Sequence, residues 1–400
     1  MASALASFAL SLFIYLETFN IEARALNTLL VPLGILLILD ASRREIFMIG
    51  FFTGLLWFWW IGLSFRFTDY PFLTPIAAIG VAIVYGALFW LMGFLPLWGR
   101  AIGLAFGFLA IEPLSFTWFK PELVLVNSFY SVHKAAFFCL VSAAGCYLHL
   151  QRHRGEKWWL IPLGSILLIL SFALPTPKRA DMPEFRIALT HTEVPQSVKW
   201  EKPHIEAQAI DAMKRIDAAI ENGYDLIVLP EAVFVMFLNK DSDMMEELLI
   251  RSRRIAIVAG ALHLKNGHPF NSAYIFNRSK MIIADKVFLV PFGEASPLPE
   301  WMGRRINALF FDGATDYQTA EEPTDFTIGG YRFRAAICYE AGIEAMYRDA
   351  PPYMIAISNN GWFTPSTEPS FQRLLIRLYA RRYGAIVFHS ANESPSEIIY

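Results

Sequence analysis

Long apolar runs separated by short polar segments fill the first 174 residues of the chain. A membrane-spanning helix needs about 20 predominantly apolar residues, with a range of about 17–25. Seven segments approach or reach this length, and the second is the shortest. The predicted spans are approximately Ala2–Thr18, Ala25–Leu39, Ile46–Phe65, Phe72–Trp98, Ala101–Phe119, Lys134–Leu150 and Lys157–Leu174. Residues 1–174 are therefore expected to form a transmembrane domain of about seven helices.

Residues 175–184 separate this region from a segment of different character. They hold three prolines and several charged side chains, which is typical of a linker between domains. From residue 185 to residue 400, short β-favouring runs bounded by turn residues alternate with amphipathic stretches. The predicted strands are Phe185–His191, Asp225–Leu229, Ile255–Leu264, Ser272–Asn277, Met281–Asp285, Arg334–Tyr339, Tyr353–Ser358 and Ala385–Ser390.

Three amphipathic stretches of the second region are predicted to be helices. Their apolar residues recur at spacings of three or four, as on one face of a helix. The three ranges are Ile205–Ile220, Asp241–Arg253 and Ser370–Tyr383. Because strands such as 226–229 are continuously apolar, their sheet is expected to be buried on both faces, as in an α/β domain.

The composition agrees with one membrane domain and one water-exposed domain. Hydrophobic residues make up 55% and charged residues 18% of the 400-residue chain, against about 45–50% and about 25% in soluble proteins. Ten basic and eight acidic residues fall within residues 1–172, whereas the remaining 228 residues hold 24 and 28. The net charge of −2 gives no concentrated basic surface, so nucleic acid is not an expected partner.

Basic residues in the loops between the predicted spans indicate the orientation of the membrane domain. With a cytoplasmic N-terminus, more of them lie in inside loops than in outside loops. The inside set is Arg43, Arg44, Arg100, Arg152, Arg154 and Lys157, and the outside set is Arg24, Arg66, Lys120 and Lys134. An odd number of spans then puts the second domain on the far side, which for a bacterial inner membrane is the periplasm.

Other distinctive residues of the membrane region have ordinary structural explanations. Cys139 and Cys146 are seven positions apart and are expected on one helix face as small apolar residues. Glu112 is either a functional carboxylate within the membrane or a residue near a helix end. His149 and His153 have the i,i+4 spacing of metal ligands but lie in a basic loop sequence. No metal or other cofactor is expected.

Three of the predicted strands end in reactive side chains, namely Glu231, Lys286 and Cys338. The carboxyl ends of strands are where α/β sheets present their chemistry. A carboxylate can take a thiol proton, the thiolate can attack a carbonyl carbon, and an ammonium can stabilise the resulting oxyanion. Taken alone, each residue is more often an inert buried cysteine or an ordinary surface charge than a catalytic group. Together they predict nucleophilic catalysis.

The sequence around each of these residues resembles a signature of the nitrilase superfamily, which uses a Glu-Lys-Cys triad. The three blocks are Leu229-Pro-Glu231, Asp285-Lys-Val-Phe-Leu-Val-Pro-Phe-Gly-Glu294 and Ile337-Cys-Tyr-Glu340. Two further blocks, Val194-Pro-Gln-Ser-Val-Lys-Trp200 and Asn359-Asn-Gly-Trp-Phe363, are similar to the membrane-bound branch of that superfamily, apolipoprotein N-acyltransferase. The spans that precede these blocks agree with this branch.

The resemblance implies a role for each member of the triad and a fold to hold it. Glu231 would be the general base, Lys286 the lysine that stabilises the oxyanion, and Cys338 the nucleophile. The implied fold is a nitrilase-like α/β domain, a four-layer α-β-β-α sandwich. It would stand on the multi-span membrane domain with its site facing the bilayer.

Four further residues match supporting positions of the family. Glu294 and Glu340 match acidic positions, Tyr339 the residue after the nucleophile, and Trp200 an aromatic residue that gates or contacts acyl chains. Glu340 lies two residues beyond the nucleophile, and in an extended strand that spacing puts both side chains on one face. Glu340 is therefore expected to tune the site without carrying the proton.

The resemblance implies a membrane acyltransferase that moves a fatty acyl group from a phospholipid, through a thioester on Cys338, to an amine on a lipoprotein. A membrane-tethered amidase that hydrolyses a C–N bond is the alternative enzyme. The non-enzymatic alternative is an envelope protein that keeps the nitrilase fold as a scaffold. A membrane nitrilase-like protein encoded among the conjugal-transfer genes of Ti-type plasmids has this general design.

The chain stops at Tyr400, where the family continues into a closing β-hairpin and a final span. The resemblance therefore implies a sandwich that is C-terminally short and tethered on one side only. It also implies a sheet edge that is left unpaired unless another segment covers it.

Overall fold

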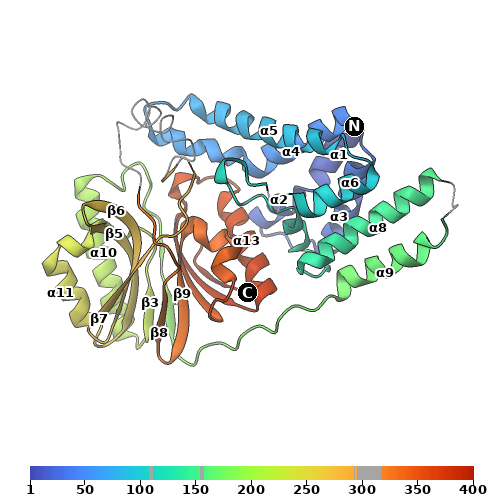
Figure 1. Ribbon diagram of the computed structural model, residues 1–400. Helices are drawn as coiled ribbons and strands as arrows, with labels where there is room; N and C mark the ends of the chain where they lie inside the picture. The colour runs from blue at the N-terminus through green and yellow to red at the C-terminus, as the bar shows by residue number, and fades with distance from the viewer. Residues whose placement is uncertain (108–110, 154–156, 292, 295–316) are drawn as a thin grey trace. The chain divides into compact units, whose positions relative to one another are not determined.

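The computed structural model describes residues 1–107, 111–153, 157–291, 293–294 and 317–400 (Figure 1). The chain forms two compact units. The first comprises Met1–Arg66 and Tyr70–Pro177, and the second comprises Phe67–Asp69 and Lys178–Tyr400.

Helices build the first unit. Their bounds are α1 Ala2–Ala9, α2 Leu12–Thr18, α3 Arg24–Asp40, α4 Arg43–Phe58, η1 Trp59–Phe67, α5 Leu73–Met92, α6 Leu97–Ile102, η2 Gly103–Gly107, η3 Pro113–Ser115, η4 Pro121–Leu125, α8 Lys134–Arg152 and α9 Leu160–Ala173. Within the described ranges, the stretches Arg43–Phe67 and Leu73–Met92 are long and apolar enough to cross a membrane, and Leu160–Ala173 is a shorter apolar helix. The count of seven spans stays a prediction.

Helix α5 is shorter than the predicted span at its position, Phe72–Trp98. It ends at Met92 because Gly93 and Pro96 follow, and a proline ring is incompatible with the preceding helical turn. A new short helix, α6, then begins at Leu97.

The predicted span Ala101–Phe119 is wrong as one continuous helix. Its first part is helical, but residues 111–119 contain only the three-residue turn η3. Pro113 has no amide hydrogen for a helical bond, and Ser115 has a φ of 60°, which lies outside the right-handed helical region.

Two six-stranded sheets form the centre of the second unit. One has the order β1-β3-β5-β6-β7, with β4 paired to β5, and the other has the order β12-β11-β10-β9-β8, with β2 paired to β11. The strands are β1 Ile187–Leu189, β2 His191–Thr192, β3 Leu226–Val228, β4 Phe234–Phe237, β5 Ala256–Lys265, β6 His268–Asn277, β7 Lys280–Asp285, β8 Asp325–Ile328, β9 Tyr331–Ile337, β10 Tyr353–Asn359, β11 Ile386–Asn392 and β12 Glu397–Ile399. The helices are α10 Lys202–Glu221, η5 Leu238–Lys240, α11 Ser242–Arg251, η6 Cys338–Gly342, η7 Glu344–Tyr347, η8 Asn360–Trp362 and α13 Glu368–Tyr383.

Two hydrophobic clusters hold the layers of this unit together. Successive side chains of a strand point to opposite faces of the sheet. Leu226 and Val228 of β3 therefore pack against Phe333 and Ile355 of the other sheet, whereas Ile227 packs in the cluster that contains α10. With α10 and α11 outside one sheet and α13 outside the other, the layers follow the expected order α-β-β-α (Figure 1).

The strands and helices predicted for residues 185–400 are all present, with ends shifted by a few residues. Strands β4, β8 and β12 were not predicted, because runs of three or four residues give little periodicity. The sheet edge that could have been left unpaired at β11 is covered, since β12 pairs antiparallel with β11 and Phe388 lies opposite Ile398.

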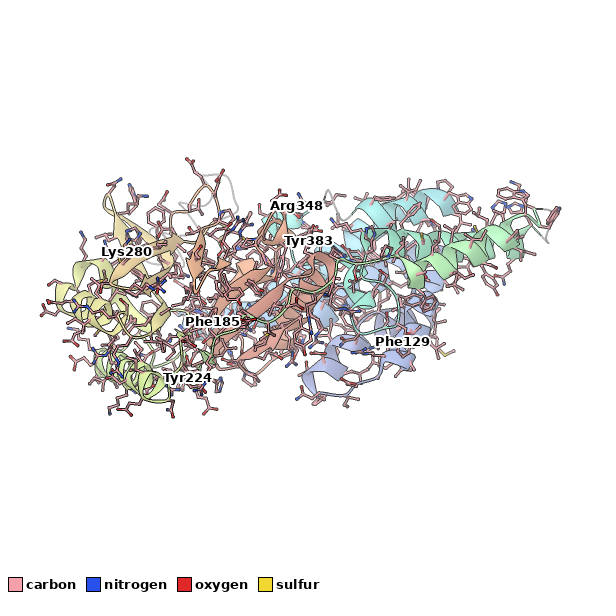
Figure 2. All side chains as sticks on the ribbon, turned by 90° about the horizontal axis from the view of Figure 1, so that it is seen from below. Phe129, Phe185, Tyr224, Lys280, Arg348 and Tyr383 are labelled. Atoms are coloured by element: carbon pink, nitrogen blue, oxygen red, sulfur yellow. The ribbon has the colours of Figure 1, made fainter. Side chains whose placement is uncertain are left out.

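The C-terminal end of α13 is tied to the turn η7 by one carboxylate. Oε1 of Glu344 accepts hydrogen bonds from Arg382 (3.2 Å) and from the Tyr383 hydroxyl (3.0 Å). Arg348, labelled with Tyr383 in Figure 2, forms an ion pair with Oε2 of the same carboxylate. These bonds fix the position of α13, whose other end lies near the candidate site.

Candidate active site

The three reactive residues predicted at strand ends lie there in the structure. Glu231 follows β3, Lys286 follows β7 and Cys338 follows β9. Strand β3 runs parallel to β5, and β7 is antiparallel to β6, which is itself antiparallel to β5. Strands β3 and β7 therefore run in the same direction. Their carboxyl ends place Glu231 and Lys286 at the same end of the strands of one sheet.

Lys286 is the centre of a buried polar network. Its side chain is 1% exposed, and its Nζ atom lies 2.6 Å from Oε2 of Glu294 and 4.0 Å from Oε1 of Glu231. Asn271 joins the two carboxylates by donating from Nδ2 to both, at 2.8 Å each. We call these four residues the lysine-centred network. Burial alone lowers the pKa of Lys286, but the two carboxylates outweigh it and raise that pKa, so the side chain stays an ammonium.

Glu231 is positioned to act as a base toward Cys338. Its Oε2 atom accepts a hydrogen bond from the backbone N–H of Asn359 (2.7 Å), and the Cys338 thiol lies close enough to the carboxylate to lower its pKa. Burial raises the pKa of Glu231, and the Lys286 charge partly opposes this rise. A buried carboxylate of raised pKa in contact with a thiol is a suitable general base.

A close approach of β5 fixes the turn that carries Glu231. A Cβ atom on Gly260 would lie 2.5 Å from the amide nitrogen of Ala232 and 2.6 Å from the Cα atom of Glu231. Only glycine fits at that distance, so the backbone of Glu231 rests directly on the neighbouring strand.

Cys338 begins the turn η6 in an unusual backbone conformation. Its φ of 54° lies in the left-handed region, which costs a non-glycine residue free energy and is found often at functional sites. Burial raises the pKa of the thiol well above its usual value, the Glu231 charge raises it further, and Lys286 opposes both. The resting group is therefore a thiol, and reaction requires a base to remove its proton.

The expected placement of Glu340 on an extended strand beside Cys338 is wrong. Strand β9 ends at Ile337, and the left-handed conformation of Cys338 turns the chain into η6. The Glu340 carboxylate instead accepts three backbone hydrogen bonds, from Val287 (2.6 Å), Phe288 (3.0 Å) and Ile337 (2.8 Å). We call this arrangement the Glu340 clamp, because it joins the segment after Lys286 to the residue before Cys338.

The other residues matched by resemblance have different environments. Glu294 belongs to the lysine-centred network, and its Oε2 atom also accepts the N–H of Val290 (2.9 Å). Tyr339 is buried, whereas Trp200 is 44% exposed. Phe292, which belongs to the Asp285–Glu294 block together with Glu294, lies outside the described residues.

Several residues near the triad were not identified from the sequence. Asn271 lies within β6 and has no recognisable signature. Burial first, and then the charges of Glu294 and Glu231, raise the pKa of Tyr317 to about 12.

Lys199 is buried and donates to Oε1 of Gln208 (3.2 Å). Burial lowers its pKa to about 8, although Glu231 opposes this. A lysine beside a tryptophan in a recognised block was the only available signal.

Glu368 is a further buried carboxyl group near the triad. Burial and the charge of Glu231 raise its pKa to about 8. As the first residue of α13 it reads in the sequence as an ordinary acidic residue in a first helical turn. Throughout the described ranges, no group of three or more His, Cys, Asp or Glu side chains is arranged to hold a metal ion.

Comparisons with known proteins cover both parts of the chain. The family described as the apolipoprotein N-acyltransferase integral membrane domain matches residues 1–172, and the carbon-nitrogen hydrolase family matches residues 194–387. An apolipoprotein N-acyltransferase of Wolinella succinogenes is 41% identical over 394 residues, covering 97% of this chain and 93% of the relative. One of Helicobacter pylori is 35% identical, covering 94% and 87%. With an N-terminal membrane domain and a C-terminal carbon-nitrogen hydrolase domain, the chain belongs to the apolipoprotein N-acyltransferase family.

Proposed function

We propose that this chain transfers a fatty acyl group from a phospholipid to an amine of a lipoprotein, with Cys338 as the covalent carrier. The observation that supports this best is the cluster of buried Glu231 and Lys286 with half-buried Cys338, in which a carboxylate and an ammonium interact with a thiol. The membrane domain favours a lipid donor, and the names of the relatives favour a lipoprotein acceptor.

In the first half-reaction, Glu231 removes the thiol proton of Cys338, and the sulfur attacks the ester carbonyl carbon of the phospholipid. The carbonyl oxygen becomes an oxyanion, which the Lys286 ammonium stabilises. When the C–O bond breaks, the leaving lysophospholipid oxygen takes the proton from Glu231. The acyl group remains on Cys338 as a thioester.

In the second half-reaction, a neutral amine attacks the thioester carbonyl carbon, and Lys286 again stabilises the oxyanion. The C–N bond forms and the C–S bond breaks. Glu231 takes a proton from the attacking nitrogen and passes it to the leaving sulfur, which restores the Cys338 thiol. One ester is consumed and one amide is formed, so the sequence of steps needs no oxidant, reductant or cofactor.

The orientation in the membrane is part of the proposal. Residues 1–174 would cross a bacterial inner membrane about seven times, and residues 175–184 would link them to a periplasmic catalytic domain. A reporter fused after Pro183 should then read as outside the cytoplasm, and one inserted between residues 152 and 157 as inside. Both reporters in one compartment would show that the predicted span between them, Lys157–Leu174, does not cross the membrane, so that the span count is wrong.

Trp200 is proposed to contact the acyl chain. Its side chain is a large exposed aromatic, and the adjacent Lys199 lies close enough to Glu231 to feel its charge. Trp200→Ala should therefore slow acylation by phospholipid more than it slows alkylation of Cys338 by a small reagent.

Mass spectrometry of the purified protein mixed with phospholipid tests the central step. We expect an acyl adduct on the peptide that contains Cys338, and none in Cys338→Ala. An adduct that persists until an amine is added supports a transferase. Steady release of free fatty acid without an amine would instead indicate a hydrolase.

A further inference from the structure

A fourth carboxyl group accompanies the site at the N-terminal end of α13. Glu368 is the first residue of this 16-residue helix and is 2% exposed. Its Oε2 atom is buried and makes no hydrogen bond within the described part of the chain. Burial of a polar atom without a partner costs free energy. A purely structural role leaves that cost unexplained.

Other polar atoms at this end of α13 are also buried without a hydrogen-bond partner within the described ranges. Oγ1 of Thr367, Nε2 of Gln372 and Oδ1 of Asn360 are buried and also have no hydrogen-bond partner among the residues described. Asn360 donates from Nδ2 to Oε1 of Gln372 (3.3 Å), so η8 and α13 are in direct contact there. Such a group of unused donors and acceptors suits a polar ligand better than an acyl chain.

Glu368 also interacts with the reacting groups. The charge of Glu231 adds to burial in raising the pKa of Glu368, and the charge of Glu368 raises the pKa of the Cys338 thiol. Helix α13 packs against η6, the turn that begins at Cys338. The carboxyl group therefore lies within electrostatic range of both the base and the nucleophile.

The proposed second half-reaction contains a proton that the triad does not handle. A primary amine is largely an ammonium at neutral pH, since α-amino groups have pKa values of about 7.7–8.0. The ammonium must lose one proton before it attacks and a second one afterwards. Glu231 accounts only for the second, because that proton goes on to the leaving sulfur.

We propose that Glu368 binds the ammonium group of the acceptor and takes its first proton, leaving Glu231 to take the second. This inference rests on the proposed function, because it requires an amine acceptor. The Glu368 carboxylate and the ammonium become a carboxylic acid and a neutral amine, whose nitrogen forms the new C–N bond as the C–S bond breaks. Glu368 then gives its proton to water, so one proton is released for each amide formed.

The two half-reactions use different forms of Glu368. An ionised Glu368 opposes formation of the Cys338 thiolate, so the protonated form suits the first half-reaction. Once the sulfur carries an acyl group, no thiolate remains to be repelled. The ionised form can then pair with the incoming ammonium.

The test compares the two half-reactions in Glu368→Gln. Single-turnover mass spectrometry measures thioester formation from phospholipid, and a lipopeptide with a free amine, added to preformed acyl-enzyme, measures transfer. E368Q should form the thioester at least as fast as the wild type and transfer the acyl group about 10²-fold more slowly, at the low end of acid–base effects. A matched lipopeptide with an aminooxy group, which is neutral at the same pH, should be acylated at nearly equal rates by both proteins.

Two further variants control the experiment. Glu246→Gln, exposed on α11, should leave both half-reactions unchanged. Glu368→Asp keeps the acid and should recover part of the transfer rate, and it gives a second test where E368Q folds poorly. Equal slowing of both half-reactions, or an equal loss with amine and aminooxy acceptors, would overturn the inference. If the wild type forms no thioester at all, the proposed function itself is refuted and the inference falls with it.

Discussion

The lysine-centred network and the Glu340 clamp hold their buried carboxylates in different ways. In the network, Glu231 and Glu294 each accept a hydrogen bond from a side chain. In the clamp, the carboxylate of Glu340 accepts three hydrogen bonds from backbone N–H groups. The network contains Glu231, the proposed base toward Cys338, whereas the clamp holds Ile337, the residue before Cys338.

This difference separates a role in the reaction from a role in holding the structure. A proton that moves onto Glu231 alters the charges felt by Lys286 and Cys338, so the network can take part in a reaction. The backbone donors of the clamp do not change charge, so we expect the clamp mainly to fix geometry. We therefore expect substitutions in the network to change rates, and substitutions in the clamp to change stability first.

The largest effect is expected at Cys338, the proposed nucleophile. Cys338→Ala and Cys338→Ser should abolish the acyl adduct because the thiolate is removed, while unfolding changes little because the replacements are small. Intact-mass spectra and thermal unfolding measure the two properties. Cys139→Ala is the control and should keep the adduct; normal labelling of the Cys338 variants would contradict the assignment.

Glu231, the proposed general base, should give the next largest effect. Glu231→Gln keeps the shape of the side chain but cannot accept the thiol proton. Single-turnover acylation should slow by roughly 10²–10⁴-fold, as is typical of lost general-base catalysis. Glu340→Gln is the matched comparison and should slow acylation less. A larger loss at Glu340 would show that the clamp, and not the network, holds the base.

The elements and the three strand ends of the catalytic domain were predictable because they depend on local pattern. Continuously apolar runs such as 226–229 form buried strands, and the reactive residues directly follow them. The contact between Glu231 and Asn271 was not predictable, because it depends on which strands pair within the sheet. The proximity of Glu368 to Cys338 depends on the packing of α13 against η6. The sequence of neither segment alone predicts that packing.

Two errors have conformational causes. Glu340 was placed on a strand because apolar character continues up to Cys338, and the left-handed φ of 54° at that residue has no counterpart in hydropathy. The predicted span Ala101–Phe119 is apolar enough for a helix, but hydropathy does not register the backbone break at Ser115. At Cys338 one residue in an unusual conformation ends the strand, whereas the described part of the predicted span is already non-helical at residues 111–112, before Ser115.

Loss of the Glu340 clamp should lower the thermal stability of the protein. Glu340→Gln replaces one acceptor oxygen with an amide donor, so a backbone N–H that now donates to Glu340 loses its acceptor. An unsatisfied buried donor costs about 1–3 kcal/mol, which should lower the thermal midpoint of the full chain in detergent. Glu246→Gln on the surface of α11 should leave that midpoint unchanged. An unaltered midpoint in E340Q would contradict a structural role for the clamp.

The smallest effect concerns the pH dependence of this stability. Burial is the main cause that raises the pKa of Glu340 from its ordinary value of 4.5 to about 7, against opposing contributions from Lys286 and the backbone donors. Between these values the native state holds a proton that the unfolded state has released. Folding therefore binds a proton, and the free energy of unfolding falls as pH rises across this window, by at most about 1.4 kcal/mol per pH unit.

The variant that cannot titrate isolates this contribution. Between about pH 5 and 7, thermal midpoints of the wild type should fall more steeply than those of Glu340→Gln, and above the raised pKa the two curves should run parallel. Subtracting the curves removes the contributions of Glu368 and of other groups that both proteins share. A difference that stays constant across the window would mean that Glu340 is already ionised at pH 5, so that its three backbone donors outweigh the cost of burying its charge.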